Sequence, residues 1–336
     1  MPDTALAAVL AGAIMISLNA YVVLGGADFG GGVWDLLATG PRRQRQRELI
    51  ANAIGPIWEA NHVWLILVIV LLFTCFPSVF ARISITLHIP LSLMLVGIVL
   101  RGSAFTFRSY DSQQDDVQRR WGAVFAGASI VTPVLLGVIV GTVAAGRIRG
   151  TPSGSFVAGY VAPWLGPFPI AVGVLALVLF AFLAAVYLTL ETDEDDLRED
   201  FRRRALGAGL AAFGAAALVL ALAYWSAPLV WTELLGARWA ALLHVVTAIA
   251  AIAALWALWT RRWRLARSTA ILQVSCIIWG WGLAQYPYLL PPDLTYAAAA
   301  APTITLKLVL GALAAGLLVL IPSLYYLFRV FKSRTA

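Results

Sequence analysis

A short stretch of the chain sets ionisable and amide side chains into apolar surroundings. Glu59, Asn61 and His62 lie in the sequence GPIWEANHVW, which opens an apolar run that continues to Phe76. About 20 apolar residues suffice to cross a bilayer. Each charge inside such a span costs about 2.5–3.5 kcal/mol, so these groups are expected where protons, ions or substrate pass. Glu59 and His62, at positions i and i+3, share a helix face and could interact directly. Asn61 is one residue from His62 and cannot share its face, so it is expected to contact another helix. The alternative is an interhelical hydrogen bond with no transport role.

A second acid, Asp28, lies among five glycines in the sequence GGADFGGGVWDLLA. Asp28 precedes the loop 39–48 by about ten residues and Glu59 follows it by about ten, so both are expected roughly 15 Å from that end of the span. Small residues let helices pack closely in lipid, which would isolate Asp28 beside a neighbouring helix. A simple packing seam is the alternative. Two acids at one depth predict a proton path, in which Glu59 loads the proton and Asp28 and His62 tune it.

Further polar residues are candidates for contacts with a cofactor or an anion. Arg101, in the sequence RGSAFTFR, could extend to the headgroups or bind a buried anion, and both alternatives remain open. The candidate cofactor contacts are Trp58, Asn61, Arg101 and Gln285. No metal site is expected, because the three histidines fall in different apolar runs and no CxxCH haem-attachment sequence occurs. The two cysteines, Cys75 and Cys276, fit small buried apolar residues.

The composition is that of a membrane protein, so the candidate polar residues must lie on long transmembrane helices. The chain is 61% hydrophobic and 12% charged, with a mean hydropathy of +0.85. Soluble domains carry about 25% charged residues. No cleavable signal peptide is expected, because the first residues lack a basic region. The sequence predicts an all-α integral membrane protein of nine transmembrane helices, at about 5–38, 50–76, 82–107, 121–146, 163–190, 205–230, 238–260, 268–290 and 302–328.

The basic residues predict the orientation of these helices. The net charge is +7, and 18 of the 24 Lys and Arg residues fall in alternate loops and in the C-terminal tail. The positive-inside rule therefore places the N-terminus outside and the C-terminus in the cytoplasm. Charge distributed in this way reports topology and does not indicate a nucleic-acid partner. The loops and the tail that carry these residues are 39–48, 108–120, 191–204, 261–267 and 329–336.

The motifs, in order along the chain, resemble subunit II of the cytochrome bd-type quinol oxidases. The resemblance rests on GGADFGGGVWDLLA, GPIWEANHVWLI, RGSAFTFR, GWGLAQYPYLLPPDLTY and IPSLYYLFRVFK. It implies a single transmembrane domain over 1–336, with two four-helix bundles, at about 5–146 and 163–290, and one peripheral helix at about 302–328. In the family, the acid of the W-[DE]-x-N motif belongs to a proton path, and this role carries over to Glu59.

The resemblance also implies partners and cofactors. A haem-bearing subunit I would hold haems b and d and oxidise quinol, and dioxygen would be reduced to water with protons taken from the cytoplasm. This chain would ligate no haem itself, but could hold a structural quinone or a lipid. A small single-helix accessory subunit and the lipids of the bacterial plasma membrane complete the expected partners.

The sequence departs from the family pattern at two positions. Many members have an acid at the position of Gly25, and many have an acid at the position of Thr106. These departures indicate a divergent branch, for which the cyanide-insensitive-like and related bd-type oxidases are candidates. Two other functions remain open: a proton-coupled secondary transporter, which would usually show inverted repeats, and a non-catalytic scaffold or assembly subunit.

Overall fold

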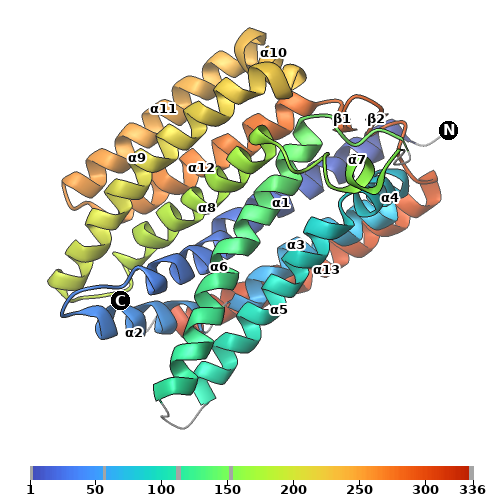
Figure 1. The fold of residues 1–336 in the computed structure, drawn as a ribbon. Coiled ribbons are helices and arrows are strands. Elements are labelled where there is room, and N and C mark those ends of the chain that lie inside the picture. Colours follow the sequence, from blue (N-terminus) through green and yellow to red (C-terminus); the bar gives the residue numbers. More distant parts are fainter. Residues whose placement is uncertain (1–2, 56–57, 111–114, 151–153, 333–336) are drawn as a thin grey trace.

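The computed structural model describes residues 3–55, 58–110, 115–150 and 154–332. Within these ranges the chain is helical except for one short two-stranded antiparallel sheet and the connecting loops (Figure 1). The elements are α1 (Thr4–Leu36), α2 (Arg43–Ile54), α3 (Trp58–Cys75), α4 (Pro77–Thr86), α5 (His88–Tyr110), α6 (Asp115–Ala144), α7 (Phe156–Tyr160), α8 (Pro167–Leu188), α9 (Asp195–Ser226), α10 (Pro228–Gly236), α11 (Arg238–Trp259), α12 (Trp263–Gln285), β1 (Tyr288–Leu290), β2 (Leu294–Thr295) and α13 (Thr303–Lys332).

Eight helices in the described ranges are long and apolar enough to cross a membrane: α1, α3, α5, α6, α8, α9, α11 and α13. The all-helical membrane fold is therefore confirmed. The ninth predicted span, 268–290, coincides with most of α12, a helix of 23 residues. α12 is not among those eight; its apolar stretch is interrupted by Gln273, ends at Gln285 and follows two arginines, Arg264 and Arg267. Nine spans thus remain a prediction.

Three of the predicted runs are divided between helices. The run 82–107 contains the end of α4 and most of α5, which are separated at Leu87. The run 50–76 contains the last turn of α2, which is capped at Gly55, and the whole of α3. The run 205–230 contains most of α9 and the start of α10, which begins at Pro228. Glycine and proline are the residues that most often interrupt a helix, and an apolar run alone does not reveal such a break. Glu59 consequently lies in the first turn of α3, and not in the middle of a continuous helix.

Helix α1 is the centre of the packing. It contacts α3, α6, α8, α12 and α13, while α5 packs on α6 and α9 packs on α8 and α11 (Figure 1). The close approach of α1 to α8 depends on glycines. A Cβ atom on Gly26 would lie 2.6 Å from Cδ1 of Phe180, and one on Gly30 would lie 2.0 Å from the Phe180 carbonyl oxygen. The glycine cluster is therefore a packing seam, and this seam runs past Asp28.

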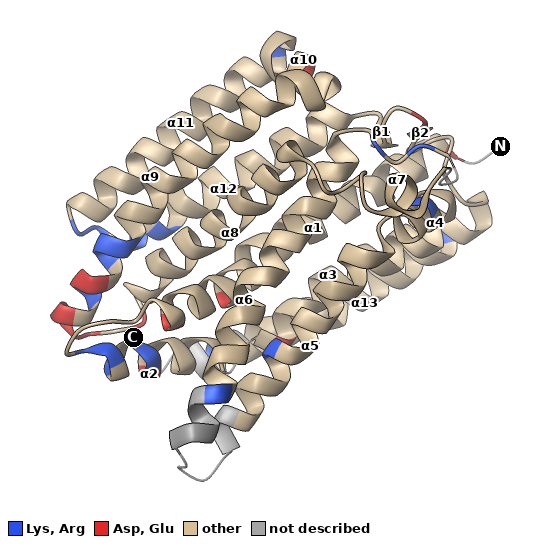
Figure 2. Ribbon diagram, in the orientation of Figure 1, with Lys and Arg blue, Asp and Glu red and all other residues tan. Residues whose placement is uncertain are grey.

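Lysine and arginine gather at one end of the helices. Figure 2 shows them around α2, the first turns of α9 and the α11–α12 connection. This arginine-rich end is the end that the positive-inside rule assigns to the cytoplasm. Ion pairs connect its elements: Arg42, which precedes α2, pairs with Asp200 of α9, and Arg45 of α2 pairs with Glu194.

Candidate functional site

Three polar side chains from three helices meet in the interior: Asp28 of α1, Asn61 of α3 and Arg101 of α5. All are buried, with relative exposures of 4%, 2% and 2%. Asn61 donates from Nδ2 to Oδ2 of Asp28 at 2.8 Å and to the carbonyl oxygen of Leu24 at 3.4 Å. The prediction that Asn61 contacts another helix is confirmed. We call Asp28, Asn61 and Arg101 the polar cluster.

Arg101 is held by the backbone of α1 and by aromatic rings. Its Nη2 donates to the carbonyl oxygen of Asp28 at 2.8 Å. Its guanidinium carbon lies 4.7 Å from the ring centre of Phe29 and 5.3 Å from that of Phe125. Because the side chain is fully buried, the alternative in which it extends to the headgroups is wrong. A cation over desolvated aromatic faces gains about 2 kcal/mol or more, which offsets part of the cost of burial.

His62 lies beside the polar cluster, among aromatic rings. Its ring centre is 5.8 Å from that of Tyr21, 6.0 Å from that of Phe29 and 6.0 Å from that of Trp58. Trp58 also contacts Phe105, at 6.3 Å between ring centres. His62 therefore faces α1, and its ring is surrounded by apolar side chains.

Glu59 points away from this interior. Its side chain is exposed, and among the described residues it makes no hydrogen bond or ion pair, so the direct contact with His62 that the spacing allowed is not formed. Three residues turn a helix by about 300°, which leaves the two side chains about 60° apart. Glu59 shares the exposed face of α3 with Ile66 and Phe73, which are 58% and 61% exposed. A carboxylate in the first turn also interacts favourably with the helix dipole, by about 0.3–1 kcal/mol.

The depth of the two acids relative to each other follows from Asn61. Because Asn61 touches Asp28 and lies two residues after Glu59, Glu59 is within about 3 Å of the same level along α3. The predicted common depth is therefore supported. The distance of roughly 15 Å between these acids and the cytoplasmic end of the span stays a prediction.

A cavity of about 620 Å³ reaches the polar cluster from the arginine-rich end. It lies between α1, α2, α8 and α12, and it ends among half-buried residues of the α8–α9 loop and exposed residues of α12. Water in this cavity would contact the carboxylate of Asp28. Sequence analysis missed this feature, although the i, i+3 spacing of Arg264 and Arg267 marks one face of α12. The polar residues of the lining include Asp28, Asn61, Tyr187, Glu191, Arg264 and Arg267.

Two other candidates lie apart from the polar cluster. Gln285 is buried at the last residue of α12, the end of that helix remote from the arginine-rich end. Thr106 donates its hydroxyl to the carbonyl oxygen of Gly102 in its own helix, at 3.1 Å. No group of three His, Cys, Asp or Glu side chains with a geometry for a metal ion occurs in the ranges that the structure describes.

Comparison with known proteins gives consistent matches. The family model described as "Cytochrome bd terminal oxidase subunit II" matches residues 6–331. Cytochrome bd ubiquinol oxidase subunit 2 of Bacillus subtilis is 29% identical over 52% of this chain and 50% of its own length. Cytochrome bd-I ubiquinol oxidase subunit 2 of Escherichia coli K12 is 28% identical over 53% and 46%. These alignments span about half the length of each relative.

Two further matches extend over almost the whole chain. A putative cytochrome bd menaquinol oxidase subunit II of Bacillus subtilis is 20% identical over 93% of this chain and 91% of its own length. A chain in the structure of bd oxidase from Geobacillus thermodenitrificans superimposes with a TM-score of 0.81 at 23% identity, over 97% of this chain and 98% of that chain. At this identity the structural match shows the fold.

Proposed function

Because the chain belongs to the cytochrome bd terminal oxidase subunit II family, we propose that it is subunit II of a membrane quinol:dioxygen oxidoreductase. In this function it supports a haem-bearing subunit I and carries part of a proton path from the cytoplasm. The substrate class is taken from the relatives, whose names specify ubiquinol and menaquinol oxidases. Haems b and d would be held by subunit I, and a small accessory subunit and membrane lipids would complete the complex.

The observation that carries the proton path is the placement of Asp28 and Glu59 on either side of Asn61. Asp28 lines the cavity that reaches the arginine-rich end. Glu59 lies two residues from Asn61, on the outward face of α3. Protons would enter from the arginine-rich end through water in the cavity and would be loaded and released at Glu59, with Asp28 and His62 tuning that group. Asn61 donates a hydrogen bond to Asp28, so its role is to hold the acid in place while the proton moves through water.

The exposed position of Glu59 supports a partner on that face. A carboxylate facing lipid from within a span is costly, and such residues usually face a protein interior or a water-filled space. The surrounding surface of α3 and α5 is apolar, with Ile66, Phe73, Leu95 and Val99 more than half exposed. A haem-bearing subunit packed here would cover this surface and receive the proton.

The proposal includes a topology. α12 would be the ninth span, with the N-terminus outside and the arginine-rich end in the cytoplasm. Helices α1, α3, α5 and α6 would form the first four-helix bundle, and α8, α9, α11 and α12 the second. α13, which contacts α1 and α3 and is otherwise mostly exposed, would be the peripheral helix.

Co-purification tests this function. The chain would be affinity-tagged and purified from membranes in mild detergent. We expect a second, haem-bearing subunit in the same preparation, a reduced-minus-oxidised haem spectrum and quinol-dependent oxygen consumption. A stable preparation that lacks both haem and a partner subunit would overturn the proposal.

A further inference from the structure

A second, smaller cavity lies at the arginine-rich end, where the α1–α2 connection meets α9. Its volume is about 260 Å³. Nothing in the proposed proton path uses it. We call it the arginine pocket, and the lining residues that matter are Gly40, Arg42, Gln46, Asp200, Arg203 and Arg204.

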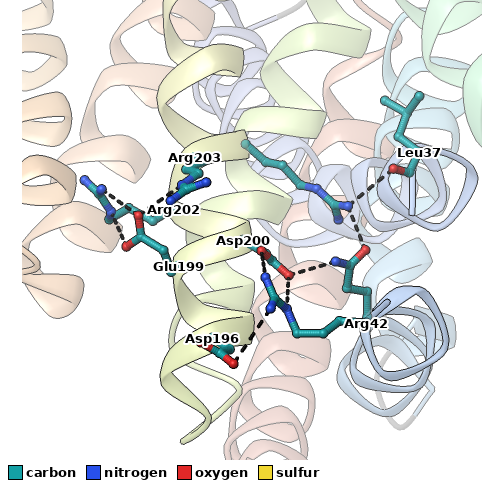
Figure 3. A network of polar contacts seen from close by, with 9 residues as sticks. Leu37, Arg42, Asp196, Glu199, Asp200, Arg202 and Arg203 are labelled. Carbon is teal, nitrogen blue, oxygen red and sulfur yellow. Dashed lines mark hydrogen bonds and ion pairs between the residues drawn. The ribbon is translucent and has the colours of Figure 1, made fainter. Parts of the chain in front are cut away.

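Hydrogen bonds fix the walls of the arginine pocket. Arg42 binds Asp200 with two bonds, from Nε at 2.9 Å and from Nη2 at 2.7 Å (Figure 3). Gln46 donates to the same carboxylate at 2.8 Å and accepts from Nη2 of Arg204 at 2.7 Å. Both carboxylate oxygens of Asp200 therefore accept hydrogen bonds, from Gln46 of α2 and from Arg42, which precedes α2. A site whose walls are already held in place loses little entropy when it binds a ligand.

The lining carries more positive than negative charge. Its lining residues include three arginines, Arg42, Arg203 and Arg204, and one acid, Asp200. Arg42 also lies 3.7 Å from Asp196, which is outside the lining. Arg203 does bond to Glu199, at 3.2 Å, but Glu199 is also bound by Arg202 at 2.7 Å and lies 3.6 Å from Arg261. The charge of Arg203 is therefore only partly balanced, and its side chain is 75% exposed. Clustered guanidinium groups match the oxygen geometry of a phosphate group.

The surroundings of the arginine pocket favour a lipid as the source of the phosphate. Leu36 and Leu37, at the end of α1, are 48% and 50% exposed. The carbonyl oxygen of Leu37 accepts from Nη2 of Arg204 at 3.3 Å, so this apolar surface adjoins the wall of the pocket. A phospholipid would place its phosphate at the arginines and its acyl chains over the leucines. Basic residues at the cytoplasmic surface of a membrane also attract anionic lipids.

We propose that the arginine pocket binds a phosphate group, supplied by the headgroup of an anionic membrane phospholipid. The bound lipid would bridge the α1–α2 connection and α9. Arg203 is the most exposed cation of the site and would close over the phosphate. This inference is independent of the proposed oxidase function.

Charge reversal of one arginine tests the site, with another arginine as a matched control. Arg203 and Arg261 both pair with Glu199 and both have exposed side chains, at 75% and 67%, but only Arg203 lines the arginine pocket. The protein, purified together with its native partners and delipidated in detergent, would be titrated with dioleoyl phosphatidylglycerol, with dioleoyl phosphatidylcholine and with inorganic phosphate. Bound lipid would be counted by native mass spectrometry.

We expect phosphatidylglycerol to bind the unchanged protein more tightly than phosphatidylcholine does. Arg203→Glu should weaken this binding by about tenfold or more, because it removes a charged hydrogen bond. Arg261→Glu should leave it unchanged, and Arg203→Lys should retain part of it. Binding of inorganic phosphate alone, with the same dependence on Arg203, would support the phosphate site and identify a soluble phosphate as its ligand. Equal binding by Arg203→Glu and the unchanged protein, or equal losses in Arg203→Glu and Arg261→Glu, would overturn the proposal.

Discussion

Asn61 donates a hydrogen bond of 2.8 Å to the carboxylate of Asp28, and this bond joins α3 to α1 at the inner end of the large cavity. Both side chains are almost completely buried. The bond fixes the position and rotation of α3 relative to α1. It therefore determines which residues of α3 face inward and which, like Glu59, face outward.

Removal of the amide should destabilise the fold. In Asn61→Ala the carboxylate of Asp28 loses a buried donor, which costs about 1–3 kcal/mol. We expect a lower melting temperature for the purified protein, measured by the intrinsic fluorescence of its tryptophans. Asn52→Ala serves as the control, because Asn52 is exposed on α2. Equal melting temperatures for Asn61→Ala and Asn52→Ala would show that the buried bond contributes nothing to stability.

The glycine seam gives a steric prediction. In Gly30→Ala the new Cβ would lie 2.0 Å from the carbonyl oxygen of Phe180 and 2.7 Å from Cβ of Ala184, so α1 and α8 must separate. Overpacking of this kind costs about 1–3 kcal/mol or more. We expect a large loss of monodisperse protein in fluorescence-detected size exclusion.

A second glycine of the same helix is the control for this experiment. A Cβ atom on Gly12 would meet no neighbouring atom within 4 Å, so Gly12→Ala should leave the yield unchanged. If Gly30→Ala gives the same elution profile as Gly12→Ala, α1 and α8 do not approach as closely as described.

A bulky side chain at the cavity mouth should slow proton access. Ser268 lines the cavity, so Ser268→Trp would partly fill it. We expect several-fold slower quinol-driven oxygen consumption with unchanged haem content. Leu265→Trp is the matched control, since Leu265 lies on the same helix, is 38% exposed and does not line the cavity. Unchanged turnover in Ser268→Trp, in a preparation of normal haem content, would argue that protons reach Glu59 by another route.

The sequence predicted much of the fold but only part of the site. Long apolar runs and the distribution of arginines predicted the membrane helices, and the position of Asn61 beside His62 predicted its contact with another helix. The orientation of Glu59 was not predictable, because i, i+3 spacing allows a contact without requiring one. The burial of Arg101 could not be predicted from the sequence. Whether its side chain extends to the headgroups or stays buried depends on the rings that α1 and α6 pack around it, Phe29 and Phe125.

The large cavity also could not be predicted from the sequence. Its lining joins Asp28 to Arg267, which are brought together only by the packing of α1 against α8 and α12. The end of α2 was signalled by Gly55, but the apolar residues on either side concealed it.

The central claim is that the carboxylate of Glu59 carries protons. Glu59→Gln keeps the size of the side chain and removes the ionisable group, while Glu48→Gln makes the same change at an exposed position of α2. The measurement is quinol-driven oxygen consumption, together with the membrane potential, by the purified complex in sealed vesicles. We expect Glu59→Gln to assemble with normal haem content and to turn over about tenfold or more slowly. Glu59→Asp should retain most of the rate, and Asp28→Asn should slow turnover less than Glu59→Gln does. Glu48→Gln should turn over at the wild-type rate. A wild-type rate and a normal membrane potential in Glu59→Gln would contradict the proton path.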